Sequence, residues 1–236
     1  MTTASVYKFM HSQHLTHVLD EGTIKLGSLS HYRRLEGEQW IADRLEGSVE
    51  LDPQGMVITE EDNQFDTMLP PSLVGRDVKA SAGGRITFAP GVKVTIAHPE
   101  AYVFSASIGD LEQLTSLMCR KDQEGYDACI HITDIGLLAH RLFNRGVVLE
   151  LKARVREVFQ AVHCSRVSYE VLSRTAALGR APEASPFLKD IHLADQSEIR
   201  IALLPPQHIE HSMLTIRVPR PGQLFKEVFR NRPNNT

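Results

Sequence analysis

Hydrophobic and polar residues alternate in several short stretches of the chain. A period of two is the pattern of a strand with one buried face, whereas a period near 3.6 indicates a helix. Apolar runs rich in Val, Ile, Phe and Tyr therefore predict strands. We expect strands at residues 5–10, 23–29, 101–109, 126–132, 197–205 and 211–219, with a long strand or a pair of strands at 146–164.

Helices are expected where a polar capping residue precedes apolar positions at helical spacing. Ser12 is expected to cap a helix that ends at Gly22, and Asp110 to cap one that runs to Lys121. Further helices are predicted at residues 133–144 and, as short pieces, within 30–47 and 171–194.

The first half of the chain also contains turn signals rich in Pro and Gly. These signals predict two hairpins, one over residues 48–59 with its turn at 53–55 and one over 85–97 with its turn at 90–91. The segment between them, residues 60–84, is polar and broken by Pro and Gly, so we expect a mobile loop or insertion.

The order of these elements favours an α+β fold over an alternating β–α–β arrangement. We expect a single domain over residues 1–236, with a split, twisted, mainly antiparallel β core and short helices. Internal repeats and low-complexity tracts are absent from the sequence.

Composition narrows the function classes. The 236 residues are 42% hydrophobic and 23% charged, which is ordinary for a globular chain with a sizeable core. The formal net charge is −3, so no global basic field indicates nucleic-acid binding. No apolar run is long enough to span a membrane, and no secretory leader is evident, so no membrane partner is expected. Three cysteines without close pairing suggest a reduced, cytoplasmic protein.

The sequence contains few of the common catalytic or metal-binding motifs. The sequence lacks G-x-G-x-x-G, a Walker A motif and the G-x-S-x-G elbow. His11, His14 and His17 are spaced three apart, but the first and last point in different directions on a helix. Cys164 follows His163, and neighbouring strand residues face opposite sides. We therefore expect neither a metal site at these three histidines nor a cysteine–histidine nucleophile at Cys164.

Polar residues stand at the ends of three predicted strands. Ser105 and Ser107 share one face of their strand, and Glu198 and Arg200 share one face of another. Glu198 and Arg200 either form a structural ion pair or belong to a catalytic site. We expect Ser105 and Glu198 to line one cleft, with Tyr7 or Lys8 at its wall.

The order of these residues resembles the ADP-ribosyltransferase fold. In that fold a first strand carries an Arg or His that holds NAD, a middle strand ends in Ser-x-Ser, and a late strand begins with Glu/Gln-x-Glu. Here Ser105 and Ser107 match the middle element, and Gln196 and Glu198 match the last. The first element departs from the pattern, because "VYKFM" offers Lys8.

The resemblance implies an NAD-dependent enzyme that transfers ADP-ribose to a macromolecular acceptor, protein or nucleic acid. Glu198 would stabilise the oxocarbenium-like ribose, Gln196 would bind the acceptor, and Ser105 would position Glu198 or the ribose. Neither Gln196 nor Glu198 is expected in the apolar core, so folding should survive their substitution. Residues with implied NAD contacts are Tyr7, Lys8, Tyr32, Arg33, Arg34, Tyr102, Phe104, Ser107 and Arg200, of which Tyr102 or Phe104 would stack on nicotinamide and Arg33 or Arg34 would meet the pyrophosphate.

The chain also resembles, over roughly residues 6–204, a family of bacterial and phage domains of unknown function. The matching stretches are "VYKF", "YRRLEG", "VFSAS" and "QSEIR". The two resemblances together imply a role as a toxin or anti-phage effector. An antitoxin or a chaperone would then be its partner.

Two other functions remain open from sequence. One is a metal-dependent nuclease or hydrolase that uses Glu198 with Asp190 or Asp195. The other is a non-catalytic binding module of a defence or toxin–antitoxin system. The C-terminal stretch is basic and forms either a local phosphate-contacting patch or a solvated tail; its basic residues are Arg217, Arg220, Lys226, Arg230 and Arg232.

Overall fold

The fold was taken from a computed structural model of the chain. It describes residues 5–35, 45–52, 57–59, 85–87, 93–119, 125–175 and 184–230. The described part is α+β, with a mostly antiparallel sheet and a few short helices, in agreement with the expected fold class.

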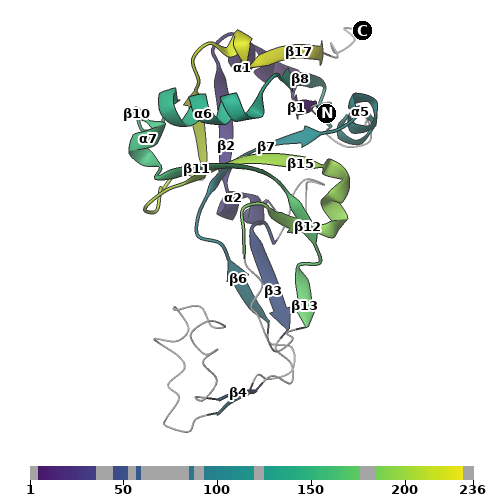
Figure 1. Cartoon of the computed structure of the whole chain (residues 1–236), viewed down its shortest axis with the longest axis vertical. Coiled ribbons are helices and arrows are strands. Elements are labelled where there is room, and N and C mark those ends of the chain that lie inside the picture. Colours follow the sequence, from purple (N-terminus) through teal and green to yellow (C-terminus); the bar gives the residue numbers. More distant parts are fainter. Residues whose placement is uncertain are drawn as a thin grey trace.

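A central strand, β7 (Tyr102–Ile108), organises the large sheet (Figure 1). On one edge it pairs with β15 (Glu198–Leu204), which pairs in turn with β11 (Ala161–Arg166). Its other edge is shared by two strands, β2 (Thr23–Ser28) and β1 (Val6–Met10).

The shared edge splits the sheet. β2 pairs with the first residues of β7, where Ser28 lies opposite Tyr102, whereas β1 pairs with its last residues, where Tyr7 lies opposite Ser107. The middle of β7, around Ser105, has neither strand as a partner on this edge. An opening in the sheet therefore lies beside the serines of β7.

The remaining strands of the large sheet extend its two sides. β8 (Ala128–Ile132) and β17 (Phe225–Arg230) continue beyond β1. β16 (Met213–Arg217), β9 (Val147–Val148) and β10 (Ala153–Arg154) continue beyond β2. Strand β17 corrects the interpretation of this stretch as a solvated tail, because Phe225 is 2% exposed and the strand is paired with β8.

Smaller sheets lie below the large one in Figure 1. β3 (Ser48–Asp52) lies between antiparallel β6 (Val94–Ala97) and parallel β13 (Ser173–Thr175). β4 (Val57–Thr59) pairs with β5 (Arg85–Thr87). The two predicted hairpins are therefore wrong, since their strands pair in a nested order. The expected mobile loop at 60–84 lies outside the described residues.

A short parallel pair adjoins the site described below. It is formed by β12 (Ser168–Glu170) and β14 (Leu188–Asp190). β14 carries Lys189 and leads directly into the 3₁₀ helix η2 (Ile191–Gln196).

Of the two helix caps predicted from the sequence, the one at Asp110 forms and the one at Ser12 does not, and a further cap that was not predicted forms at Asp134. Asp110 accepts a hydrogen bond from the Gln113 amide at 3.0 Å and begins α5 (Leu111–Met118). Asp134 accepts one from the Leu137 amide at 2.8 Å and begins α6 (Ile135–Arg145). The Ser12 hydroxyl instead donates to Asp127 at 2.6 Å, so it does not cap its helix.

The other helices are short, and none of those described has the length and apolar character needed to cross a bilayer. They are η1 (Ser12–His14), α1 (Leu15–Leu19), α2 (Leu29–Arg34), α7 (Val155–Val158) and η3 (Pro221–Gln223).

The main core lies between one face of the large sheet and the helices α1 and α6. Ile201 and Leu203 of β15 face this core together with Leu138 and Leu142 of α6, and all four are fully buried. A smaller cluster packs α5 against β1 and β8 through Phe9 and its neighbours. Because Ile201 and Leu203 face the main core, Glu198 and Arg200 lie on the opposite face of β15.

Candidate functional site

A small hollow lies beside the split in the sheet. Its volume is about 50 Å³, which is room for a few water-sized groups. The residues around it come from β1, β7, the segment around α5, and the junction of η2 with β15. They are Tyr7, Lys8, Phe9, Ser105, Ala106, Ser107, Met118, Tyr126, Gln196 and Glu198.

Strand register explains why distant polar residues meet here. Glu198 lies opposite Ser107 across the β15–β7 pair, and Arg200 lies opposite Ser105. On the other side of β7, Tyr7 lies opposite Ser107. Residues opposite one another in a ladder share a face, so the split sheet brings these side chains to one place. This is the arrangement that the sequence led us to expect for Ser105, Glu198 and Tyr7.

Gln196 and Glu198 converge through a turn and not through strand alternation. Gln196 ends η2, Glu198 begins β15, and Ser197 between them has φ 45° and ψ 52°. This left-handed conformation is unusual for a serine. It allows both flanking side chains to accept hydrogen bonds from the Lys189 ammonium, Gln196 at 2.9 Å and Glu198 at 2.8 Å.

Glu198 belongs to a buried network of four charges. Its Oε1 accepts from Lys189 at 2.8 Å and its Oε2 accepts from Arg200 Nε at 2.8 Å. The Arg200 guanidinium also donates to Glu46 and, at 2.7 Å, to the carbonyl of Pro186. All four charged side chains are at most 6% exposed. Two carboxylates and two cations thus balance one another within the fold.

This network controls ionisation. Burial alone would raise the pKa of Glu198, but Arg200 and Lys189 outweigh burial and lower that pKa to about 2. Burial raises the pKa of Glu46 despite the opposing effect of Arg200 and Lys189. Burial opposes the charge of Arg200, yet Glu46 and Glu198 raise its pKa above the ordinary value. Glu198 is therefore a fixed, ionised carboxylate at neutral pH.

The burial of this pair corrects an expectation from the sequence. Gln196 is 3% exposed and Glu198 is 6% exposed, and both accept hydrogen bonds from Lys189. Folding is thus sensitive to substitution at both positions, because the other charges of the network would lose partners.

Lys8 lines the same hollow but is not part of the charge network. Its side chain is half-buried, and its ammonium lies 5.3 Å from the centre of the Phe104 ring. Within the described ranges, no residue forms a hydrogen bond or an ion pair with it. Burial lowers the pKa of Lys8; Glu198 opposes this effect, while Lys189 and Arg200 reinforce it.

Two aromatic residues expected to stack on nicotinamide lie elsewhere. Tyr102 is fully buried in the main core, where its hydroxyl donates to the carbonyl of His211 and its ring packs edge-on against Phe159. Phe104 is 4% exposed and lies against Lys8. Neither lines the hollow, so we do not retain them as stacking groups. The aromatic side chains around the hollow are Tyr7, Phe9 and Tyr126.

The residues of α2 are also outside the hollow. Arg33 Nε donates to the carbonyl of Glu46 at 2.7 Å, and the Arg34 side chain is exposed. Burial raises the pKa of Tyr32 to about 12, and its ring lies against Gly27 of β2. Arg33 thus supports the segment that carries Glu46, and Tyr32 lies close enough to the buried charges for Arg200 and Glu198 to influence its pKa. Neither Arg33, Arg34 nor Tyr32 lines the hollow.

Sequence reasoning missed Glu46 and Lys189. Lys189 stands between Leu188 and Asp190 in an apolar stretch, and a lysine in such a position is a weak signal of buried pairing. Glu46 lies 154 positions before Arg200, and nothing in its local sequence indicates the contact.

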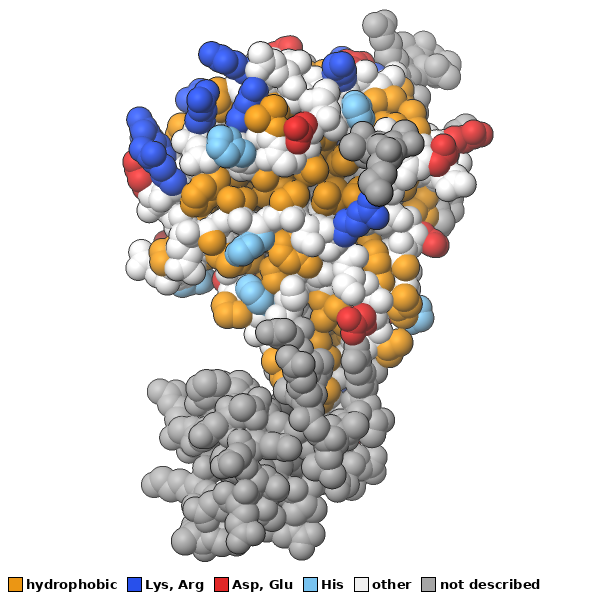
Figure 2. Space-filling model, viewed as in Figure 1, with side chains coloured by type: hydrophobic (Ala, Val, Ile, Leu, Met, Phe, Trp, Pro, Cys, Tyr) orange, Lys and Arg blue, Asp and Glu red, His pale blue; other side chains and the backbone are white. Residues whose placement is uncertain are grey.

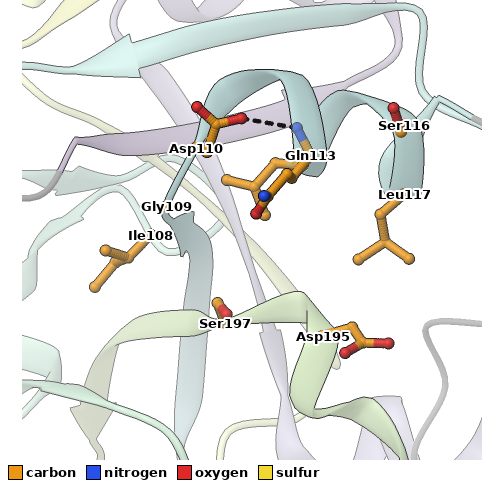
Figure 3. Close-up of a pocket in the computed structure, with 9 residues that line it drawn as sticks. Ile108, Gly109, Asp110, Gln113, Ser116, Leu117, Asp195 and Ser197 are labelled. Carbon is orange, nitrogen blue, oxygen red and sulfur yellow. Dashed lines mark hydrogen bonds between the residues drawn. The ribbon is translucent and has the colours of Figure 1, made fainter.

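A second, larger hollow adjoins the first and has a volume of about 380 Å³. It lies between α5 and the turn after η2, with Leu117 and Asp195 on facing sides (Figure 3). Asp110 and Gln113 come from the first turn of α5. Asp195 and Ser197 line this hollow, whereas Gln196 and Glu198 line the smaller one.

The histidines and carboxylates considered as metal ligands have other contacts or stand apart. Across the described ranges, no three His, Cys, Asp or Glu side chains gather in a way that could hold a metal ion. Asp190 accepts from the His192 amide at 3.0 Å, and His17 pairs with Glu21 at 3.1 Å.

Of the basic C-terminal residues, Arg232 lies outside the described residues, and the other four lie in or between β16 and β17. Arg217 lies opposite Val147 on β9, whereas Lys226 and Arg230 belong to β17, where Arg230 pairs with Glu227 at 3.2 Å. Most Lys and Arg side chains on the face in Figure 2 lie in the upper part of the molecule. Arg217, Lys226 and Arg230 are not among the residues that line the hollow.

Comparison with known proteins gave no relative. No family model, no curated protein and no solved structure matches the chain.

Proposed function

We propose that this protein is an NAD-dependent mono-ADP-ribosyltransferase that modifies a macromolecular acceptor. The observation that carries the proposal is the gathering of Ser105, Ser107, Gln196 and Glu198 around one hollow beside a split in the sheet. Lys8 lies at the same hollow, in the strand where the family pattern has an Arg or His.

Glu198 supplies a carboxylate of fixed position and charge. With a pKa of about 2 it is ionised throughout the physiological range. Arg200 and Lys189 hold both of its oxygens, so no reorganisation is needed when positive charge develops on the ribose. Such preorganised electrostatic stabilisation is a large contribution to catalysis in many enzymes.

The hollow accommodates only part of a dinucleotide. A volume of about 50 Å³ fits the edge of one sugar, whereas complete ligand pockets are roughly 300–1,000 Å³. We therefore place the reacting ribose against Ser105 and Glu198, with the rest of NAD outside the small hollow. The neighbouring hollow of about 380 Å³, which Asp195 and Ser197 line, offers space for an acceptor group.

The ion pairs of Glu198 favour a second candidate function, that of a non-catalytic binding module. Both oxygens of Glu198 already have cationic partners, and these partners offset its charge. A non-catalytic binding module would need Glu198 only to hold the Gln196–Glu198 turn against β14. In that case substitution of Glu198 would act through stability alone.

The experiment is transfer of label from NAD. The purified protein is incubated with adenylate-labelled NAD and a whole-cell lysate, and the products are divided by nuclease and protease treatment. The proposal predicts label on nucleic acid or on protein, with the label removed by only one of the two treatments. Cleavage of nucleic acid that needs a divalent cation and not NAD would contradict it and support a nuclease.

Two serines provide a matched pair for the same assay. Ser105→Ala removes a hydroxyl at the hollow, whereas Ser165→Ala removes an exposed one on β11. We expect transfer to fall by about tenfold or more for Ser105→Ala and to stay unchanged for Ser165→Ala. Equal activity in both variants would remove Ser105 from the site.

A further inference from the structure

Lys8 differs from the paired lysines of the described structure. Lys189 lies among carboxylate and amide oxygens, and Lys93 pairs with Glu50 at 2.6 Å. Lys8 lies beside an aromatic ring at the edge of a hollow, without a carboxylate in hydrogen-bonding contact in the regions that the structure resolves. A half-buried cation without a counter-ion loses hydration and gains little in return.

The surroundings of Lys8 favour its neutral form. Burial lowers the pKa of its ammonium, and the nearby cations Lys189 and Arg200 lower it further, against the opposing charge of Glu198. Desolvation and a neighbouring cation are the two conditions that make a lysine amine nucleophilic near neutral pH.

The hollow also provides groups suited to a reacting carbonyl. Ser105 and Ser107 place hydroxyl groups on the strand beside Lys8. A hydroxyl can donate a hydrogen bond to a carbonyl oxygen, or to the oxygen of the addition product that forms from it. The volume of about 50 Å³ restricts any enclosed ligand to a few heavy atoms.

We propose that Lys8 is a nucleophilic amine that condenses with small aldehydes bound in the hollow. The inference goes beyond the proposed transferase function and does not depend on NAD. It assigns to Lys8 a covalent binding site for the carbonyl group.

The reaction needs no oxidant or reductant. The lone pair of the neutral amine forms an N–C bond to the aldehyde carbon, and the carbonyl π electrons move to oxygen. A proton passes from nitrogen to that oxygen, which gives a carbinolamine. Loss of the hydroxyl with a second proton from nitrogen releases water and leaves the imine Lys–N=CH–R.

The experiment traps the imine with acetaldehyde and cyanoborohydride. Reduction converts each imine into a stable ethylamine, which peptide mapping locates at low conversion. At pH 7 we expect Lys8 to be ethylated about fivefold faster, or more, than Lys25 and Lys152, whose side chains are exposed. A rate for Lys8 equal to or below those of the exposed lysines would overturn the proposal.

A double serine variant and added inorganic phosphate distinguish a reactive amine at Lys8 from a charged ammonium. Ser105→Ala combined with Ser107→Ala should slow ethylation of Lys8 and leave that of Lys25 unchanged. Slow labelling of Lys8 that inorganic phosphate suppresses further would overturn the proposal and indicate a charged ammonium that binds anions.

NAD serves as a competitor in the same experiment. Fast ethylation that NAD suppresses supports both this proposal and the placement of NAD at the hollow. Fast ethylation that NAD leaves unchanged supports the reactive amine and contradicts the transferase site. Slow ethylation in the absence of NAD contradicts the reactive amine alone.

Discussion

Lys8 and Lys189 lie near the same carboxylate, yet their surroundings differ in the number of partners. Lys189 is 1% exposed and donates to Gln196 at 2.9 Å and to Glu198 at 2.8 Å, with Glu46 3.9 Å away. Lys8 has the Phe104 ring at 5.3 Å and no anionic contact in the described part of the chain.

The difference separates a lysine that maintains the fold from one that we propose to be chemically reactive. A buried charge with matched partners is costly to lose, because each partner becomes a buried charge without compensation. A half-buried charge without partners adds little stability. The two classes respond differently to substitution.

The largest effect is expected for Arg200. Arg200→Met would leave Glu46 and Glu198 with Lys189 as their one cation in the network. We expect the free energy of unfolding to fall by about 3–5 kcal/mol. Chemical denaturation measures this loss. The control is Arg230→Met in the exposed pair with Glu227, where the loss should stay below about 1 kcal/mol. Equal losses would show that the buried network is no more important than a surface pair.

The second effect is a pH dependence. The folded pKa of Glu198 is depressed from 4.5 to about 2, so its contribution to stability is complete above pH 4.5 and is lost as the pH falls towards 2. This contribution is about 3 kcal/mol. Glu46 has a raised pKa and acts in the opposite direction.

Comparison with Glu198→Gln isolates this one carboxylate, provided that Glu46 titrates similarly in both proteins. The difference in unfolding free energy between wild type and variant should shrink between pH 5 and pH 3 by on the order of 1 kcal/mol or more. A difference that stays constant over this range would contradict the depressed pKa.

The third effect concerns the turn between Gln196 and Glu198. Ser197 has φ 45°, which glycine adopts without strain and a β-branched residue adopts poorly. We expect Ser197→Gly to keep or raise stability by up to about 1 kcal/mol, and Ser197→Val to lower it by about 1–2 kcal/mol.

Ser165 on β11 is the matched control for this substitution, because its backbone is a paired strand. Ser165→Gly should lower the melting temperature. If both glycine variants change the melting temperature in the same direction, the left-handed turn is not the cause.

The smallest effect is expected for Lys8. Lys8→Met removes a contact with Phe104 worth about 0.5–1 kcal/mol and also removes the cost of burying an unpaired ammonium. The two changes nearly cancel, so stability should change by less than about 1 kcal/mol. Lys189→Met should cost about 3 kcal/mol, since Glu198 would lose a cation. A large loss for Lys8→Met would place Lys8 in the structural class.

Local patterns predicted most of the elements around the site. Alternation identified the strands that became β7 and β15, and a capping aspartate located the start of α5. The same alternation put Glu198 and Arg200 on one face, and the position of Ser105 and Glu198 at strand ends predicted that these two residues would line one cleft. These features depend on a few neighbouring residues, which is why the sequence reveals them.

Features that depend on distant partners were not predictable. β3 pairs with β6, which begins more than 40 positions later in the chain, and Ser197 has a left-handed backbone that its local sequence does not indicate. Glu46 reaches Arg200 from 154 positions away. The pair that the sequence predicted between Glu198 and Arg200, as one of two alternatives, is therefore part of a larger buried network.

The most direct test of the proposed transferase compares two carboxylates of the same network. Glu198→Gln and Glu46→Gln each remove one negative charge beside Arg200, and only Glu198 lines the hollow. Labelled transfer from NAD is measured under single-turnover conditions, at a temperature where both variants are folded by circular dichroism. We predict that Glu198→Gln slows transfer by on the order of 10²–10³ and that Glu46→Gln stays within a few-fold of wild type. Equal losses in the two variants, or full activity in Glu198→Gln, would contradict a catalytic role for Glu198.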